Sequence, residues 1–311
     1  MGPVDRWTKK KGIEPTVESY LRSIGIGEYQ DRKVFWEGLR EKHGPIAEQV
    51  AHAISAREEG EDVDVYPLKN ASLALSIDLT SQYCNQIYRA FLSWFCREGF
   101  PAPSSVLDLG CDSGILTCFY AMRYPEAEVV GVDRCELGVA CARELADRLH
   151  IANVRFEVCD LQSLEGSFPE EAFDLMLSTT VFHEVLRFPE DLLESWGGSI
   201  GGVKMGSEDS NSVRTVTELV KLLCDETGMF VSMERCPDAE ALAWWIRLLN
   251  QAGLKMDANR SALLSYHSLY GERETLPILV ATRSWDPATD SGDETLALRM
   301  YSEREEDATD R

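Results

Sequence analysis

The sequence predicts an α/β fold with a mostly parallel sheet, helices on both faces of the sheet and a helical N-terminal cap. After about residue 100, short apolar runs alternate with amphipathic segments of helical length, the pattern of crossover units in a parallel sheet. Before that point, apolar residues recur at helical spacing. The 311 residues are 44% hydrophobic, enough for a substantial core. We expect a cap over residues 1–100, a main domain over 101–284 and an acidic tail over 285–311.

Glycine and proline divide the cap into helices. Gly25 and Gly44 stop helical patterns, and Pro45 suits the first turn of a helix because its missing N–H has no partner there. From Asp78 onward, apolar residues at three- and four-residue spacing predict one amphipathic helix. The three helices expected before it cover residues 14–24, 29–41 and 45–56.

The main domain alternates strands and helices. Strands are expected over residues 105–109, 128–133, 153–160, 173–178, 229–234, 255–265 and 276–283. Helices are expected over residues 115–123, 135–150 and 239–252. The Gly/Ser-rich segment 196–212 has the composition of a flexible loop, either a lid or a linker, and the acidic tail is expected to be frayed.

Charge and cysteine content exclude several classes of protein. With 31 Lys+Arg against 53 Asp+Glu, the net charge of −22 repels phosphate backbones and anionic lipid, so a nucleic-acid partner would need a local basic patch. No apolar run has the length of a membrane span, and we expect no signal peptide. The nine cysteines show no C-x-x-C spacing, which favours reduced thiols in a cytoplasmic protein over disulfides or a zinc site.

Acidic residues end three successive strands of the main domain. The first precedes a glycine turn in Asp108-Leu-Gly-Cys-Asp-Ser-Gly114, and the others are Asp133 and Asp160. Glycines after a strand let a ligand approach the backbone closely. A carboxylate at the next strand end can accept hydrogen bonds from two ribose hydroxyls. The pattern therefore predicts a nucleoside-containing ligand at the carboxyl ends of the strands.

These motifs, together with Phe173-Asp-Leu-Met-Leu-Ser178, resemble those of class I S-adenosylmethionine-dependent methyltransferases over about residues 104–283. The resemblance implies a Rossmann-like sheet with an antiparallel final strand, S-adenosylmethionine as cofactor, and methyl transfer. It places the first acid and its loop at the methionine part, the second acid at the ribose and the third beside the adenine. The residues assigned to the cofactor are Asp108, Gly110, Cys111, Asp112, Gly114, Asp133, Arg134, Asp160, Leu161, Ser178 and Thr179.

The loop departs from the family pattern at Asp112, which stands where the usual D-x-G-x-G-x-G has its middle glycine. The acidic residues of this loop also disfavour cofactors that bind through a phosphate. A phosphate-binding loop would carry Lys and Ser/Thr after its glycines, and Asp108 and Asp112 place negative charge where a pyrophosphate would lie. The cationic sulfonium and amino groups of S-adenosylmethionine suit such a site better.

Two residues after the fourth strand are candidates for catalysis. His183 is the one histidine among five at a strand end of the expected cleft, and it could act as a general base or simply pack against the adenosyl pocket. Glu184 could pair with a cationic substrate nitrogen, or it could simply stabilise the start of a helix by interacting with the helix dipole. A neutral amine acceptor would need no base. No cluster has metal-ligand spacing.

The favoured function is methyl transfer to a nitrogen or oxygen of a small molecule. The alternatives are a protein methyltransferase, a tRNA methyltransferase, which the net charge disfavours, and a non-catalytic S-adenosylmethionine-binding module. The oligomeric state stays open, a homodimer included. The cap aromatics could form a substrate pocket or the core of the cap; they are Tyr20, Tyr29, Phe35, Trp36, Tyr83 and Tyr88.

Overall fold

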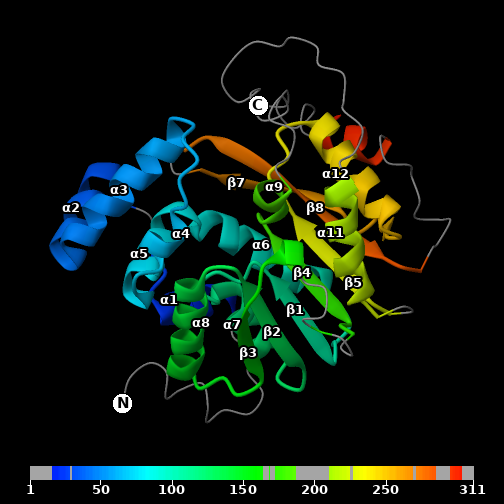
Figure 1. Cartoon of the computed structure of the whole chain (residues 1–311), viewed down its shortest axis with the longest axis horizontal. Coiled ribbons are helices and arrows are strands. Elements are labelled where there is room, and N and C mark those ends of the chain that lie inside the picture. The colour runs from blue at the N-terminus through cyan, green and yellow to red at the C-terminus, as the bar shows by residue number, and fades with distance from the viewer. Residues whose placement is uncertain are drawn as a thin grey trace. The chain divides into compact units, whose positions relative to one another are not determined.

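The computed structural model describes residues 16–28, 30–163, 168, 172–186, 210–224, 227–268, 271–284 and 295–302. The chain divides into two compact units, which interleave along the sequence (Figure 1). Unit 1 contains residues 1–102, 111–158 and 266–274, and unit 2 contains residues 103–110, 159–265 and 275–311. Residues 196–209 of the expected flexible loop lie outside the described residues.

Unit 1 begins with six helices. They are α1 (Val17–Ile24), α2 (Arg32–His43), α3 (Pro45–Glu58), α4 (Tyr66–Lys69), α5 (Leu73–Tyr83) and α6 (Asn85–Glu98). Glycine ends α1 as expected, since Gly25 has a left-handed φ of 100°. The single helix expected from Asp78 onward is wrong, because α5 and α6 are separate and meet at Cys84. Neither glycine nor proline marks this break, so the apolar periodicity runs through it.

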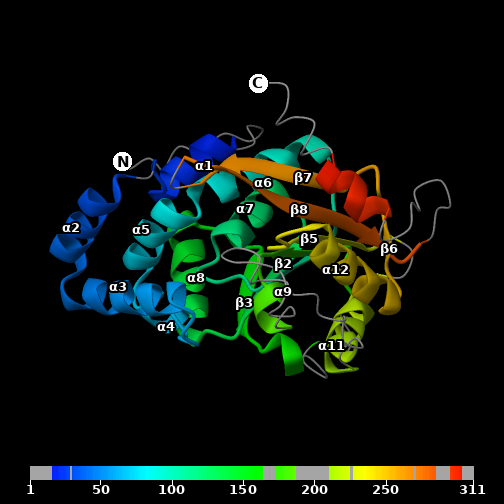
Figure 2. The same cartoon turned by 90° about the horizontal axis from the view of Figure 1, so that it is seen from above.

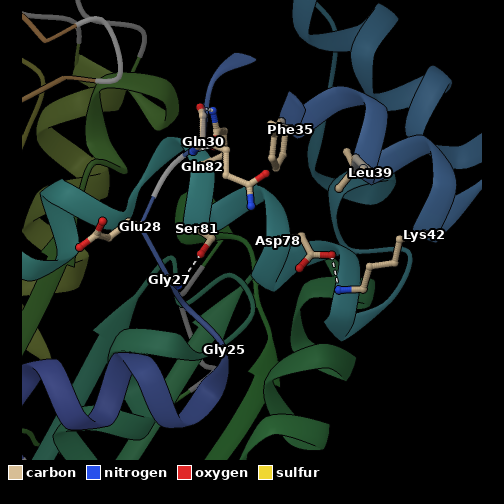
Figure 3. Close-up of a pocket in the computed structure, with 11 residues that line it drawn as sticks. Gly25, Gly27, Glu28, Gln30, Phe35, Leu39, Lys42, Asp78, Ser81 and Gln82 are labelled. Atoms are coloured by element: carbon tan, nitrogen blue, oxygen red, sulfur yellow. Dashed lines mark hydrogen bonds and ion pairs between the residues drawn. The ribbon is translucent and has the colours of Figure 1, made fainter. Parts of the chain in front are cut away.

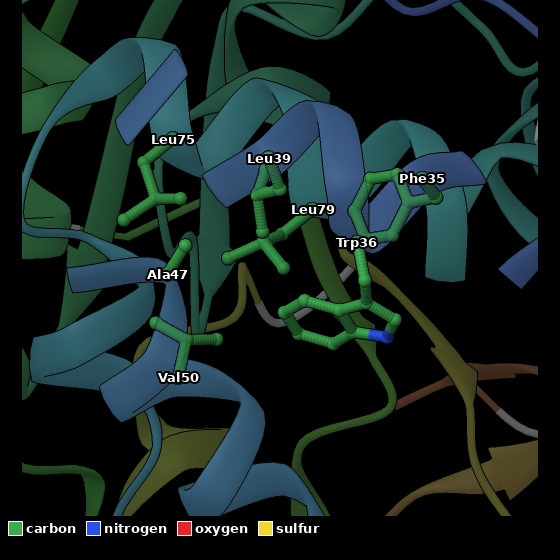
Figure 4. Close-up of a cluster of buried hydrophobic side chains, with 7 residues drawn as sticks. All are labelled: Phe35, Trp36, Leu39, Ala47, Val50, Leu75 and Leu79. Carbon is green, nitrogen blue, oxygen red and sulfur yellow. The ribbon is translucent and has the colours of Figure 1, made fainter. Parts of the chain in front are cut away.

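A hydrophobic cluster joins α2, α3 and α5 in unit 1 (Figure 4). The chain reverses at Gly44, whose φ is 63°, so that α2 and α3 lie side by side. The buried members of the cluster are Phe35, Trp36, Leu39, Ala47, Val50, Leu75 and Leu79. Phe35 and Trp36 therefore serve the core of this helical region, one of the two uses left open for the cap aromatics.

The rest of unit 1 is a strand–helix pattern that follows the sequence expectation closely. It comprises α7 (Ile115–Arg123), β2 (Glu128–Asp133), α8 (Glu136–Leu149) and β3 (Val154–Val158). Strands β2 and β3 are parallel, with Asp133 opposite Val158. Because β3 ends there, Asp160 lies beyond the strand in which it was expected.

Unit 2 holds the strands β1 (Ser105–Leu109), β4 (Leu175–Thr179), β5 (Met229–Met233), β6 (Lys255–Met256), β7 (Ala262–His267) and, in large part, β8 (Arg273–Thr282). Within this unit the order is β1-β4-β5-β8-β6, and β7 also pairs with β8. The first three strands are parallel, and β8 is antiparallel to β5. This mixed sheet confirms the expected fold class and its antiparallel final strand. The strand expected over residues 255–265 is instead two strands, separated by the turn around Asp257.

The described helices of unit 2 are a single 3-10 turn (Leu161–Ser163), α9 (Phe182–Val185), α11 (Ser210–Lys221), α12 (Ala239–Gln251) and a segment over 295–302. Helices α11 and α12 lie side by side (Figure 2). Residues 210–212, assigned to the flexible loop, are helical. The expectation of a frayed tail is wrong for residues 295–302, because that helix buries Leu296 and Met300.

Two global expectations concern membranes and thiols. Across the described parts of the chain, no helix combines the length and the apolar character needed to cross a bilayer. All nine cysteines are free thiols. Burial raises the pKa of the Cys141 thiol to about 11, so this group stays protonated and poorly nucleophilic near neutral pH.

Candidate active site

The loop after β1 needs glycine at two places for steric reasons. Gly110 has a φ of 71°, and a Cβ built there would lie 2.4 Å from Cγ2 of Val181 in the same unit. Gly114 begins α7 with a φ of 75°, and its Cβ would lie 2.7 Å from the Cβ of Ala142 in unit 1. Both distances are far below a van der Waals contact, so a side chain at either glycine would force Val181 or Ala142 to move.

In unit 1, backbone N–H groups hold both oxygens of Asp133. Oδ2 accepts from the N–H of Asp112 and Oδ1 from the N–H of Cys135, each at 2.8 Å. Burial raises the pKa of Asp133, and the two N–H donors oppose that effect. Each carboxylate oxygen keeps a further lone pair. The Asp133 carboxylate can therefore accept hydrogen bonds from two neighbouring hydroxyls while keeping its hydrogen bonds to the N–H groups of Asp112 and Cys135.

Asp112 is tied to two residues that the sequence did not single out. Its Oδ2 forms an ion pair with Nζ of Lys69, and its Oδ1 accepts from Nδ2 of Asn70 at 2.7 Å. Burial alone would raise the pKa of Asp112, but Lys69, the Asn70 amide and the N–H of Ser113 together hold that pKa below its ordinary value. Because the charge of Asp112 is compensated, this residue does not repel a phosphate as the sequence argument assumed.

Four other residues assigned to the cofactor have distinct surroundings. Arg134 is exposed and reaches Asp64, with 3.5 Å between Nη2 and Oδ2. Cys111 is buried and donates its N–H to the carbonyl of Val132. In unit 2, Asp160 is exposed and accepts from the N–H of Gln162 at 2.9 Å, while Leu161 is buried. Asp160 is therefore accessible for a polar contact, whereas Leu161 packs within the unit.

A buried carboxylate, Glu234, organises the strand ends of unit 2. It is 1% exposed and follows β5 directly. Its Oε1 accepts from the hydroxyl of Ser178 at 3.0 Å and from the N–H of Val181 at 3.3 Å. Its Oε2 lies 3.1 Å from Nδ1 of His183. Sequence reasoning overlooked Glu234, although it is a further acid at the end of an expected strand.

The contact with Glu234 fixes the orientation of the His183 ring. A carboxylate only accepts hydrogen bonds, so Nδ1 is the donor in this contact and Nε2 is the ring nitrogen left for other partners. Glu184 lies on the other side of the ring, with 3.8 Å between its Oε1 and Nε2. Among the described residues, the structure thus brings His183, Glu184 and Ser178 together around one buried acid, in an arrangement that can take up a proton at Nε2.

Several buried hydroxyls have no hydrogen-bond partner within the described parts of the chain, Ser76 and Thr80 of α5 among them. Two more are Oγ of Ser113 in unit 1 and Oγ1 of Thr179 in unit 2. Thr180, which follows, has a left-handed φ of 55°. Orphaned buried hydroxyls and a strained backbone are costly in a fold and cluster where a polar ligand supplies the missing partner. Both residues adjoin the loop and strand ends already described.

A hollow of about 330 Å³ lies elsewhere in unit 1, between α2 and α5 (Figure 3). Its polar groups are engaged with one another: Nζ of Lys42 is 2.6 Å from Oδ2 of Asp78, and the N–H of Gly27 donates to Ser81 at 2.8 Å. Gln82 makes two hydrogen bonds with the backbone of Gln30. The contacts with Ser81 and Gln82 hold Gly27 and Gln30 on α5, and we assign the hollow no chemistry. The described residues also contain no His/Cys/Asp/Glu cluster able to hold a metal.

Residues 102–245 match the family model described as a methyltransferase domain. With the parallel strands, the glycine loop and the strand-end carboxylates, this match makes residues 102–245 similar to the class of methyltransferase domains whose motifs the sequence carries.

Within that class the chain is similar to three named relatives. It is 35% identical over 36% of its length to a trans-aconitate 2-methyltransferase of Mycobacterium sp. (strain KMS), and it spans 40% of the length of that protein. It is 28% identical over 62% of its length to the trans-aconitate 2-methyltransferase of Mycolicibacterium gilvum, spanning 74% of it. A ubiquinone biosynthesis O-methyltransferase of Rhodopseudomonas palustris is 33% identical over 33% of the chain and 36% of the relative.

Proposed function

We propose that the protein transfers a methyl group from S-adenosylmethionine to a nitrogen or oxygen of a small molecule. The observation that carries the proposal is the Asp133 carboxylate, placed at a strand end with both oxygens supported by N–H groups within a matched methyltransferase domain. Such a group fits the two ribose hydroxyls of the cofactor.

The cofactor would be held by the residues that the motifs assign. Asp108 and the 110–114 loop would contact its methionine part, Asp133 its ribose, and Asp160 with Leu161 its adenine. The unpartnered hydroxyls of Ser113 and Thr179 support this assignment, because both need a polar partner. When bound, S-adenosylmethionine supplies an electrophilic methyl group on a sulfonium centre.

His183 is the proposed proton acceptor for a hydroxyl substrate. Glu234 holds its Nδ1–H, so the Nε2 lone pair is directed and available. For an amine acceptor, Glu184 would instead pair with the charge on the substrate nitrogen. No base would be needed, and the site would contribute only by aligning the amine with the methyl group. The described acids near His183 disfavour a tricarboxylate acceptor, so the substrate of the trans-aconitate relatives is not carried over to this chain.

The remaining parts of the proposal concern partners and location. A cytoplasmic setting is supported by the nine free thiols. A nucleic-acid substrate is disfavoured by the net charge of −22. A protein substrate, a role as a non-catalytic cofactor-binding module and a homodimer remain alternatives that no contact in the described residues favours.

The deciding experiment is to incubate the purified protein with S-adenosylmethionine and pools of small hydroxyl, carboxyl and amine compounds. Formation of S-adenosylhomocysteine and of a product heavier by one methylene group is followed by mass spectrometry. Turnover with a small molecule supports the proposal. Cofactor binding without turnover on any pool, but with binding of a partner protein, would favour the non-catalytic module.

A further inference from the structure

We propose that Lys69 and Asn70 are positioning residues for the cofactor site: they fix and neutralise Asp112, which in turn holds the Asp133 carboxylate in place. This inference rests on the proposed function, since it assigns these residues a role in cofactor binding. All four residues belong to unit 1. Lys69 ends α4, a helix that precedes every motif of the methyltransferase domain.

The connection is a continuous set of short contacts. Nζ of Lys69 pairs with Oδ2 of Asp112, and Nδ2 of Asn70 donates a hydrogen bond to Oδ1 of Asp112. The backbone N–H of Asp112 in turn donates to Oδ2 of Asp133. Asp112 has a left-handed φ of 47°, a conformation that a glycine would adopt at no cost. The side-chain contacts thus hold the loop in the shape that the family's glycine takes freely.

The packing around Asn70 indicates a built site rather than a surface contact. Asn70 is 1% exposed. A Cβ at Gly138, in the first turn of α8, would lie 3.1 Å from Nδ2 of Asn70 and 3.3 Å from the carbonyl of Asp112. The glycine therefore lets α8 approach this amide closely. Removing either partner of the buried ion pair would leave an uncompensated charge in the same confined space.

Charge compensation is the second part of the role. Asp112 and Asp133 are linked through one N–H, and the negative charge of Asp112 raises the pKa of Asp133 while Lys69 lowers it. Burial lowers the pKa of Lys69, but the nearby acidic groups, Asp112 foremost, raise it by more. Lys69 therefore remains protonated. Of the neighbouring charges in unit 1, Arg134 pairs with Asp64. Without Lys69, two adjacent carboxylates would compete for one proton.

The test uses calorimetric binding of S-adenosylhomocysteine to the full chain at several pH values, because two adjacent carboxylates without a cation beside them resist ionising together. The variants are K69M, K69R and the double variant D112N/K69M, in which a neutral asparagine side chain replaces the carboxylate and tolerates the left-handed backbone. Lys42→Met is the matched control, because it also removes a Lys–Asp pair of unit 1. Thermal melts establish that each variant is folded, and K69Q replaces K69M if the latter is not.

We expect K69M to weaken binding about tenfold or more and to make it pH-dependent, since one pKa unit corresponds to a tenfold change in a linked equilibrium. K69R and K42M should stay near wild type, and D112N/K69M should return to within about threefold without the pH dependence. Wild-type affinity in K69M, or a double variant no better than K69M, would overturn the inference. The latter result would mean that Lys69 contacts the ligand itself. A wild-type chain that binds no S-adenosylhomocysteine would overturn the proposed function, and this inference with it.

Discussion

Each oxygen of Asp133 is supported by one N–H and has capacity for one further donor. Asp133→Ala should therefore weaken S-adenosylmethionine binding by roughly 2–4 kcal/mol, since a hydrogen bond to a charged group contributes about 1.5–3 kcal/mol and two such bonds are not fully additive. Calorimetric titration measures the loss. Asp64→Ala is the control, because it removes an exposed acid of the same unit. An affinity for the Asp133 variant within a factor of three of wild type would exclude the ribose assignment.

His183 and Glu234 make a separate prediction about the chemical step. If the imidazole takes the proton of a hydroxyl substrate, His183→Gln should lose about 10²–10⁴-fold in kcat. Glu234→Gln keeps the shape of the buried acceptor but loses its charge, so kcat should fall by a smaller factor. Both variants should bind cofactor normally. Retention of more than a third of the rate by the His183 variant would favour an amine acceptor.

The residue scale also shows the limit of sequence reasoning. The acids Asp133 and Asp160 could be found because each follows an apolar run, and Asp108 because it lies one residue before the end of such a run. Glu234 could have been found in the same way. Lys69 and Asn70 could not, because a contact with Asp112 across more than 40 residues depends on how the helices pack. No local pattern in residues 66–70 carries that information.

At the scale of elements, the strands were more predictable than the helices before them. Buried parallel strands are continuous apolar runs, so β1 and β2 fall where the sequence places them. The break between α5 and α6 is set by tertiary packing, and the apolar pattern continues across it. Short elements such as α4 and β6 have too few residues to show a period.

Helix α12 supports the helix that carries His183. Trp245 of α12 is 1% exposed, lies 5.0 Å from the ring of Phe182 in α9, and donates its indole N–H to Ser232 of β5. Trp245→Ala should cost about 3–5 kcal/mol of unfolding free energy, as for other buried aromatics. It should also lower kcat, because a displacement of about 1 Å at a catalytic group can cost a hundredfold.

Urea unfolding and steady-state kinetics test the two effects of this substitution. Trp94→Ala is the matched control, since Trp94 is a buried tryptophan of α6 in unit 1. It should destabilise the chain similarly without lowering kcat at a temperature where both variants are folded. Equal losses of kcat in the two variants would show that α12 has no particular effect on His183.

For the whole molecule, the net charge of −22 should limit stability through self-repulsion. Raising NaCl from about 0.05 M to about 0.5 M shortens the screening length and should raise Tm by a few degrees, given about 2–4 °C per kcal/mol for a chain of this size class. Scanning calorimetry at constant pH measures the shift. An unchanged or lower Tm at high salt would mean that the acidic groups are already compensated by local pairs.

The helix over residues 295–302 has a consequence for how the protein is made. It buries Leu296, Ala297 and Met300 in unit 2, and Tyr301 donates its hydroxyl to the carbonyl of Cys236. Unit 2 also needs β1, synthesised far earlier in the chain, and β8, which lies between β5 and β6. A nascent chain on the ribosome therefore exposes the edge of β5 until β8 has been synthesised. Chaperones that shield unpaired strand edges have their longest opportunity to act during that interval.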